Sequence, residues 1–307
     1  MSRPALTIGV SLKMYFGQRQ TIDWCRAVAG LARRHPALTS GAVELLVLPA
    51  APLIDQVLRV FAGLPVGVGA QDLCGADSGP FTGEVSGALL REMGCRYAEV
   101  GHAERRRLFG EDNATAAAKV AASWRNGLDP VLCVGESAQA PPRDAALACV
   151  AEAREVLDQA AAGLPTARRR VILAYEPHWA IGQPEPAPPD HIAQVTAVLK
   201  HWLAEREFAG SPVIYGGSAG PGLLTSVRDS VDGLFLGRFA HDPDGLETIL
   251  DEALAIARWR TSAGQMAPRS SAGQPAANAT AAQATAAQAK AAQAKAAQAK
   301  AGTWRSG

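Results

Sequence analysis

Four side chains able to carry protons or stabilise negative charge follow short apolar segments of this sequence. They are Lys13, His102, Glu104 and Glu176. Carboxylates and imidazoles are common proton carriers in enzymes, and an ammonium group stabilises a developing anion. Each residue also has a structural explanation, as a solvated lysine, a hydrogen-bonded core histidine or a carboxylate at a rim. A cation, an imidazole and carboxylates gathered on one face would favour an active site with acid–base chemistry.

Glycine-rich turns follow two further apolar segments. Gly216–Gly217–Ser218 comes after one, and Gly237–Arg238 comes after the next. Glycine N–H groups can approach a phosphate closely, and a following helix N-terminus adds a favourable dipole. Two such turns in succession therefore favour a phosphate site, although ordinary tight turns remain an alternative.

The segments that would position these residues alternate between strand-like and helix-like patterns. Two helices with a buried face are predicted. One includes Ile192 in its buried face, and the other starts at Asp244, where Asp244 and Glu247 resemble a capping box. Strands that alternate with helices favour a mostly parallel sheet. The predicted strands are Leu6–Val10, Leu45–Leu48, Val66–Val68, Tyr97–Val100, Val131–Val134, Val171–Ala174, Val213–Tyr215 and Leu234–Leu236.

Eight βα units within about 260 residues suit a closed barrel better than an open sheet. The number of units alone does not establish that the sheet closes. In such a barrel the residues after each strand converge on one face, and that face holds the active site. The predicted topology therefore brings Lys13, His102, Glu176, Ser218 and Gly237 together.

Composition excludes several classes of protein. The chain has 307 residues, of which 48% are hydrophobic, and its formal net charge is +1. Such a balance argues against a nucleic-acid-binding protein, and no apolar run reaches the length of a membrane span. The first 17 residues show no signal-peptide pattern, and the five scattered cysteines form no CxxC pair. We therefore expect a cytoplasmic protein without a nucleic-acid or membrane partner.

The composition changes after residue 260. Residues 1–260 are predicted to form the barrel domain, and residues 261–307 form a tail rich in Ala, Gln and Lys. The tail contains five basic residues and no acidic one. It lacks the apolar residues of a core, so we expect it to be disordered or partly helical over about 279–301. A solubilising extension is the favoured interpretation, and weak contact with anionic surfaces is the alternative.

Several motifs resemble those of the triosephosphate isomerase family, in the family's order and spread over residues 6–258. The most specific are Gly101-His102-Ala103-Glu104-Arg105-Arg106 and Tyr175-Glu176-Pro177-His178-Trp179-Ala180-Ile181-Gly182. Others are Lys13-Met14, Ala70-Gln71, Phe81-Thr82-Gly83-Glu84-Val85-Ser86, Leu132-Cys133-Val134-Gly135-Glu136, Tyr215-Gly216-Gly217-Ser218 and Asp232-Gly233-Leu234-Phe235-Leu236-Gly237. The resemblance implies a (β/α)8 TIM barrel and isomerisation of a small phosphorylated sugar through an enediolate.

The resemblance also implies a role for each of the catalytic candidates. Glu176 would be the base that moves the carbon-bound proton, and His102 the electrophile that polarises the carbonyl. Lys13 would stabilise the enediolate, and Glu104 would orient Lys13, for which a buried ion pair is the structural alternative.

Other residues are implied to bind substrate or a second subunit. Gly182, Ser218, Gly237 and Arg238 would hold the phosphate beneath a lid that follows Glu176. Ser11 would also belong to the substrate-binding residues. Thr82 would reach a partner subunit's site in a homodimer. The reaction needs no cofactor and no metal, and no His/Cys/Asp cluster with ligand spacing is present in the sequence.

The sequence departs from the family pattern at four places. Ser11 replaces an asparagine beside Lys13, Ala103 replaces a serine, and Arg238 replaces a glycine. The lid is the proline-rich segment Gly182-Gln183-Pro184-Glu185-Pro186 instead of Gly-Thr-Gly-Lys-Thr. Because Glu176, His102 and Lys13 are kept while their surroundings change, we expect the chemistry to be retained and the substrate to differ.

Three functions follow from these observations. The segments Ser11–Phe16 and Leu236–Asp242 look like the branch that isomerises L-erythrulose 1-phosphate to D-erythrulose 4-phosphate, which is the favoured function. Interconversion of dihydroxyacetone phosphate and glyceraldehyde 3-phosphate is the first alternative. A non-catalytic barrel that acts as a binding protein is the second.

Overall fold

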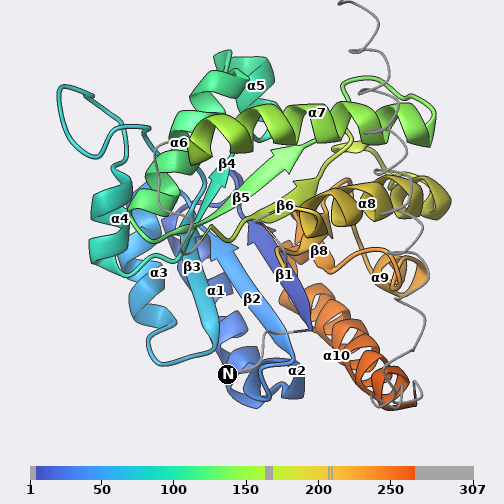
Figure 1. Cartoon of the computed structure of the whole chain (residues 1–307). Coiled ribbons are helices and arrows are strands. Elements are labelled where there is room, and N and C mark those ends of the chain that lie inside the picture. The colour runs from blue at the N-terminus through green and yellow to red at the C-terminus, as the bar shows by residue number, and fades with distance from the viewer. Residues whose placement is uncertain (1–4, 163–168, 207, 209, 267–307) are drawn as a thin grey trace, which may run out of the picture. The chain divides into compact units, whose positions relative to one another are not determined.

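The described chain forms a closed barrel of eight parallel strands surrounded by helices (Figure 1). The computed structural model describes residues 5–162, 169–206, 208 and 210–266. Each strand pairs with the next, and β1 closes the barrel by pairing Thr7 with Gly233 and Val10 with Leu236 on β8. The strands are β1 (Leu6–Ser11), β2 (Val43–Leu48), β3 (Val66–Ala70), β4 (Tyr97–Val100), β5 (Asp129–Val134), β6 (Ile172–Tyr175), β7 (Val213–Tyr215) and β8 (Gly233–Leu236).

Helices cover the outside of the barrel because each turns one apolar stripe toward the strands. In α8 the stripe includes Ile192, Val195 and Leu199, all fully buried. The α-helices are α1 (Gln18–Arg34), α2 (Pro36–Thr39), α3 (Ile54–Val60), α4 (Gly87–Met93), α5 (Ala103–Phe109), α6 (Asn113–Arg125), α7 (Pro142–Ala161), α8 (Pro189–Ala204), α9 (Leu223–Ser226) and α10 (Pro243–Met266). The 3-10 turns are η1 (Ala51–Leu53), η2 (His178–Ala180) and η3 (Arg238–His241).

A separate apolar cluster fills the inside of the barrel, where inward-facing side chains of the strands meet. Glycine makes room for the ring of Phe235 in this cluster. A Cβ at Gly9 would lie 2.6 Å from the ring of Phe235, so β1 leaves space for this ring beneath the catalytic face. The cluster consists of Leu46, Leu48, Tyr97, Val131, Cys133, Ile172, Ala174, Ile214 and Phe235.

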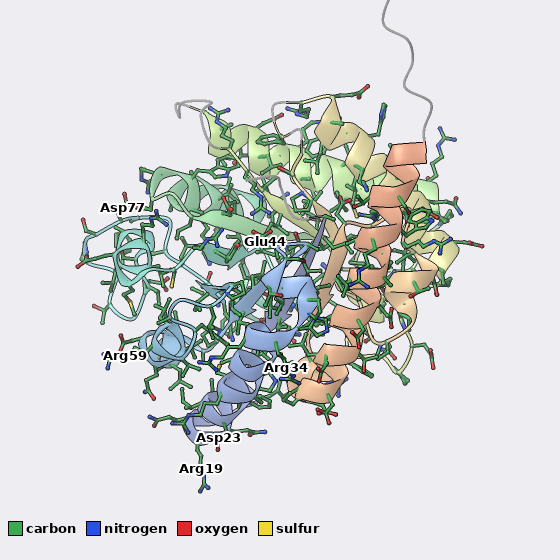
Figure 2. The ribbon with its side chains drawn as sticks, turned by 90° about the horizontal axis from the view of Figure 1, so that it is seen from below. Arg19, Asp23, Arg34, Glu44, Arg59 and Asp77 are labelled. Carbon is green, nitrogen blue, oxygen red and sulfur yellow. The ribbon has the colours of Figure 1, made fainter. Side chains whose placement is uncertain are left out.

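Many charged side chains lie on the surface, as seen from below in Figure 2, where Arg19, Asp23 and Arg59 project outward. Arg34 on α1 donates two hydrogen bonds to Glu247 on α10, at 2.9 and 3.0 Å. These bonds join the first and last helices of the ring. No helix within the described ranges is long and apolar enough to cross a membrane.

The start of α10 and the boundary of the tail are both predicted from the sequence. The capping box at Asp244 is wrong, because α10 begins at Pro243 and the side chain of Asp242 accepts the N–H of Asp244 at 3.1 Å. Proline suits the first position of a helix, so α10 begins at Pro243 and the capping residue is Asp242, directly before it. The boundary at residue 260 stays a prediction, and the predicted tail structure over 279–301 lies outside the described residues.

Candidate active site

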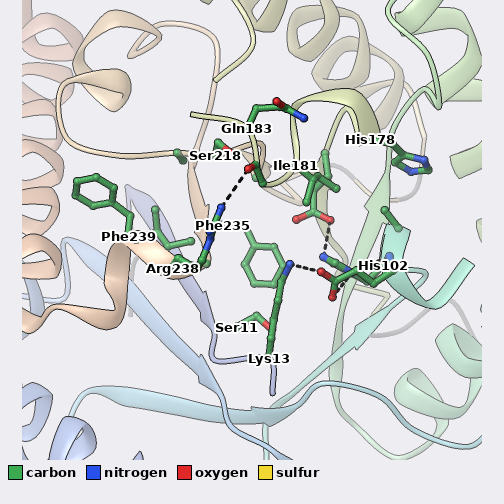
Figure 3. Close-up of a pocket in the computed structure, with 18 of the residues that line it drawn as sticks. Ser11, Lys13, His102, His178, Ile181, Gln183, Ser218, Phe235, Arg238 and Phe239 are labelled. Carbon is green, nitrogen blue, oxygen red and sulfur yellow. Dashed lines mark hydrogen bonds and ion pairs between the residues drawn. The ribbon is translucent and has the colours of Figure 1, made fainter. Parts of the chain in front are cut away.

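A cavity of about 590 Å³ opens at the carboxyl ends of the strands (Figure 3). Nine of the ten predicted site residues line it, although they come from distant parts of the sequence. The exception is Thr82, which is exposed in the loop after β3. The nine are Ser11, Lys13, His102, Glu104, Glu176, Gly182, Ser218, Gly237 and Arg238.

Lys13 is held in an uncommon backbone conformation directly after β1. Its φ is +48°, in the left-handed region that non-glycine residues rarely adopt. The Gln71 side chain fixes this turn by donating to the carbonyl oxygens of Lys13 at 3.0 Å and Leu48 at 2.9 Å. Lys13 Nζ thereby reaches across the cavity and donates to Glu104 Oε1 at 2.9 Å.

The ammonium group of Lys13 is surrounded by carboxylates. Burial alone would lower its pKa, but the hydrogen bond to Glu104 and the charges of Glu176, Glu104 and Glu99 together raise the pKa above its usual value. Burial likewise opposes ionisation of Glu104, yet its contact with Lys13 lowers the pKa of this carboxyl. Both members of the pair are therefore charged at neutral pH, and a positive charge stands in the cavity.

His102 caps α5, and this position decides which ring nitrogen carries a proton. Its Nδ1 accepts the backbone N–H of Glu104 at 3.1 Å, so the proton of the neutral imidazole lies on Nε2. The preceding Gly101 is fixed as well, because its N–H donates to Glu111 Oε1 at 3.0 Å. The result is a nearly buried imidazole with an N–H donor directed toward Glu176, at 3.4 Å from Oε2.

Glu176 directly follows β6, and its side chain lies over a glycine of the next strand end. A Cβ at Gly216 would come within 2.6 Å of Glu176 Oε1, so only glycine leaves space for the carboxylate. Oε2 is buried and accepts no hydrogen bond from the described part of the chain. A buried carboxylate oxygen without a donor is costly to maintain, and such an atom is suited to take a proton from a bound molecule.

The segment 177–188 covers one side of the cavity and is tied by three hydrogen bonds to residues in or after β5 and β7. At its start, Trp179 Nε1 donates a hydrogen bond of 2.8 Å to Oε1 of Glu136, which lies two residues after the end of β5. At its end, the N–H of Ala187 donates to the Tyr215 hydroxyl of β7 at 2.9 Å. In between, Ser218 Oγ donates to the Ala180 carbonyl at 2.9 Å. The segment is therefore fastened at both ends and at one point between them.

Arg238 makes a further tie to this segment. Its Nη2 donates to the carbonyl of Gly182 at 3.1 Å, and Figure 3 shows the side chain extending from η3 toward that carbonyl. Arg238 thus lies at the edge of the cavity on the side of Ser218, away from His102. The guanidinium adds positive charge to the side of the cavity formed by the glycine-rich turns.

Comparison with known proteins places the chain in a family. A family model described as triosephosphate isomerase matches residues 6–253. The L-erythrulose-1-phosphate isomerase of Pectobacterium atrosepticum is 52% identical over 262 residues, which cover 83% of this chain and 98% of the relative. The triosephosphate isomerase of Halorhodospira halophila is 38% identical, covering 75% and 92%. The L-erythrulose-1-phosphate isomerase of Mesorhizobium japonicum is 34% identical, covering 81% and 97%.

The chain belongs to the triosephosphate isomerase family. It is an isomerase, and the TIM barrel predicted from its motifs is confirmed. Within the described residues, no group of three or more His, Cys, Asp or Glu side chains is placed to hold a metal ion.

Glu99 is a site residue that the sequence analysis missed. Glu99 occupies an inward position of β4 beneath the cavity and is only 3% exposed. Ser11 Oγ donates to its Oε2 at 2.9 Å, and its Oε1 lies 3.9 Å from His102 Nε2. A glutamate within the otherwise apolar strand Tyr97–Val100 was the available signal, because carboxylates are rarely buried without a purpose.

The ionisation of Glu99 differs from that of the other carboxyls. Burial raises its pKa to about 7, the charge of Glu176 adds to this effect, and His102, Ser11 and Lys13 oppose it. The folded protein therefore holds a proton on Glu99 between about pH 4.5 and 7 that the unfolded chain has released. Stability from this group is present at low pH and is lost as the pH rises through 7.

Replacing Glu99 with glutamine is expected to remove this pH dependence, because the amide resembles the neutral carboxyl and does not ionise. At pH 8.5 the Glu99→Gln variant should be more stable than the parent by up to about 3 kcal/mol. The two proteins should converge at about pH 4, below the pKa of this carboxyl in the unfolded chain. Denaturant unfolding at the two pH values measures the difference, and parallel stability profiles would show that Glu99 does not titrate in this range.

Proposed function

We propose that this isomerase interconverts L-erythrulose 1-phosphate and D-erythrulose 4-phosphate. The observation that carries the reaction class is the unpartnered Oε2 of Glu176 beside His102 Nε2, with the Lys13 ammonium in the same cavity. The four-carbon substrate is supported by the relative at 52% identity, which is named for it.

Glu176 acts as the base in this proposal. In L-erythrulose 1-phosphate the carbonyl is at C2, and C3 carries one hydrogen and a hydroxyl group. Glu176 takes the C3 proton, and the electron pair left on carbon forms the C2–C3 double bond of an enediolate. The same carboxyl returns the proton to C2 while the C3 oxygen becomes the carbonyl, so no atom is gained or lost.

His102 and Lys13 serve the oxygen atoms. The Nε2–H of His102 donates to the substrate oxygens and moves a proton between them, since its tautomer is fixed by the Glu104 N–H. The ammonium of Lys13 stabilises the negative charge that develops on oxygen, and Glu104 positions this ammonium through the 2.9 Å bond. Ser11 lines the cavity on the same side as Lys13.

The phosphate is bound on the opposite side of the cavity in this proposal. The backbone of Gly182 and Gly237, the turn at Ser218 and the guanidinium of Arg238 hold it there. Ser218 supports this arrangement by its own left-handed backbone, with φ +52°, which a turn around an anion uses. The segment 177–188 closes over the reaction and keeps water from the enediolate.

Two other functions make different predictions. A triosephosphate isomerase would prefer dihydroxyacetone phosphate, in agreement with the relative at 38% identity. A binding protein would exchange no carbon-bound proton of either substrate, an interpretation that the meeting of base, imidazole and ammonium disfavours.

The experiment that separates the three is a comparison of kcat/KM for L-erythrulose 1-phosphate and dihydroxyacetone phosphate with the full chain. We expect preference for the four-carbon ketose by about 10²-fold or more, since a polar subsite discriminates strongly against a substrate that lacks the matching hydroxyl. Preference for the three-carbon ketose would overturn the proposal. Absence of solvent deuterium uptake from both would favour the binding protein.

A homodimer is part of the proposal. Next to Lys13, the side chains of Met14 and Tyr15 are 93% and 54% exposed, and Phe81, beside Thr82, is 48% exposed. Exposed apolar side chains of this size favour a covered surface. A second copy would bury them and bring its Thr82 loop toward Lys13. Sedimentation equilibrium at twice the chain mass would support this assembly, and a monomer at micromolar concentration would contradict it.

We also propose a cytoplasmic location. All five cysteines lie in the described residues and are free thiols. Free thiols suit a reducing compartment. Fractionation of the producing cells, with the protein followed by antibody, tests the location.

A further inference from the structure

Ser11 and Glu99 form a polar pair inside an otherwise apolar barrel. Ser11 lies at an inward position of β1 and lines the cavity, and Glu99 lies at an inward position of β4. The hydrogen bond of 2.9 Å between them crosses the inside of the barrel. Phe235 and Cys133 belong to the apolar cluster of the same interior, so a buried carboxyl there requires an explanation.

The other polar groups of the site do not account for this pair. His102 is already oriented by the Glu104 N–H at Nδ1, and Lys13 is already paired with Glu104. Glu99 forms no ion pair with Lys or Arg among the described residues, and its Oε1 lies 3.9 Å from His102 Nε2. The proton transfer proposed above needs only Glu176, His102 and Lys13.

The pair is located where a fourth carbon would need a partner. The two candidate substrates differ by one hydroxymethyl group, attached to the reacting carbon on the side away from the phosphate. The phosphate side of the cavity is formed by Ser218 and Arg238, after β7 and β8, whereas Ser11 and Glu99 come from β1 and β4. Figure 3 shows Ser11 beside Lys13, apart from Ser218.

The hydrogen bond to Glu99 fixes the direction in which the Ser11 hydroxyl group donates. Its hydroxyl proton points to Glu99 Oε2, so the lone pairs of Ser11 Oγ remain able to accept a hydrogen bond. A hydroxymethyl O–H is a donor that suits this acceptor, and the small serine side chain leaves space for the added carbon. The Oε1 atom of Glu99, 3.9 Å from His102 Nε2, adds a second polar atom near the same position.

We infer that Ser11 and Glu99 form the subsite for the terminal hydroxymethyl group of the substrate, in which Ser11 contacts the hydroxyl and Glu99 positions Ser11. This subsite rests on the proposed four-carbon function and gives it a structural cause. Glu99 is a positioning residue, since it acts through Ser11. The pair selects chain length and leaves proton transfer to Glu176.

The test uses kcat and KM for both ketose phosphates with three variants of the full chain. In Ser11→Ala and Glu99→Leu, kcat/KM for L-erythrulose 1-phosphate should fall by about 10- to 100-fold, the effect of losing one or two hydrogen bonds. For dihydroxyacetone phosphate it should change by less than about 3-fold, since this substrate does not occupy the subsite. Glu99→Gln keeps an acceptor for Ser11 and should restore most of the four-carbon activity.

Thr7→Ala is the matched control. Thr7 lies on β1 as well, and its Oγ1 donates to a carboxylate, Glu44 Oε2, at 3.2 Å. It lies four residues before Ser11, roughly 13 Å along the strand, so its removal should leave the ratio of the two substrates unchanged.

The outcomes separate the subsite from the proposed function. Equal losses for both substrates, or unchanged four-carbon activity in Ser11→Ala, would overturn the subsite while leaving the proposed function in place. A parent enzyme without activity on L-erythrulose 1-phosphate would overturn the function and the subsite with it. If Glu99→Leu does not fold, Ser11→Ala and Glu99→Gln still decide between these outcomes.

Discussion

Replacing Glu176 with glutamine is expected to lower kcat by roughly 10³-fold or more, the combined effect of losing a general base and its positioning. The amide has nearly the same shape but cannot take a proton from carbon. Oε2 accepts no hydrogen bond from any described side chain or backbone group, and its polar neighbour is His102 Nε2 at 3.4 Å, so the substitution should leave the folded structure largely unchanged. We therefore expect KM to change much less than kcat.

The measurement for Glu176→Gln is solvent deuterium uptake at the reacting carbon, followed by proton NMR together with turnover. Both should be lost in parallel, while the unfolding transition stays close to that of the parent. Glu205→Gln, an exposed position at the end of α8, serves as the control for loss of a carboxylate. Near-normal deuterium uptake by the Glu176→Gln variant would show that another group is the base.

Replacing Lys13 with methionine is expected to lower kcat/KM by about 10²- to 10³-fold, the usual effect of removing one group that stabilises a developing oxyanion. Methionine keeps the length of the side chain but removes the charge. Glu104, Glu176 and Glu99 then surround the cavity without the ammonium that now compensates them. Binding of a phosphorylated anion should weaken as well, so KM should rise while kcat falls.

Lys200→Met is the matched control for this loss. Lys200 also forms one partly buried ion pair, with Asp232 at 2.7 Å, but it lies on α8 outside the cavity. Its kinetic constants should stay within about 2-fold of the parent. A similar loss of activity in Lys200→Met and Lys13→Met would indicate that stability, not charge in the cavity, causes the effect.

The fold could be predicted from the sequence because its signals are local and repeat eight times. Each predicted strand overlaps the observed one, and Tyr97–Val100 and Val213–Tyr215 agree at both ends. Differences arise at strand ends, where pairing with a neighbour extends the strand. Asp129, for example, joins β5 through its register with Tyr97 of β4, a contact that the sequence does not display.

The candidate site could be predicted only in part, because its geometry depends on contacts between distant segments. Motif positions located Lys13, His102 and Glu176, but the bond between Ser11 and Glu99 joins residues 88 positions apart. The direction of Arg238 was equally open. Its bond to Gly182 O depends on how the segment after Glu176 folds over the barrel, which neither motif specifies.

The residues around the cavity come from strands on different parts of the barrel, and this affects how such enzymes can diversify. Ser11 and Glu99 belong to β1 and β4, and the residues near Ser218 and Arg238 follow β7 and β8. In the proposed arrangement, substitutions that reshape the sugar end can therefore accumulate without altering the anchor for the anionic end. A library that aims at longer or shorter ketoses would concentrate on positions 11 and 99 and leave the glycine-rich turns intact.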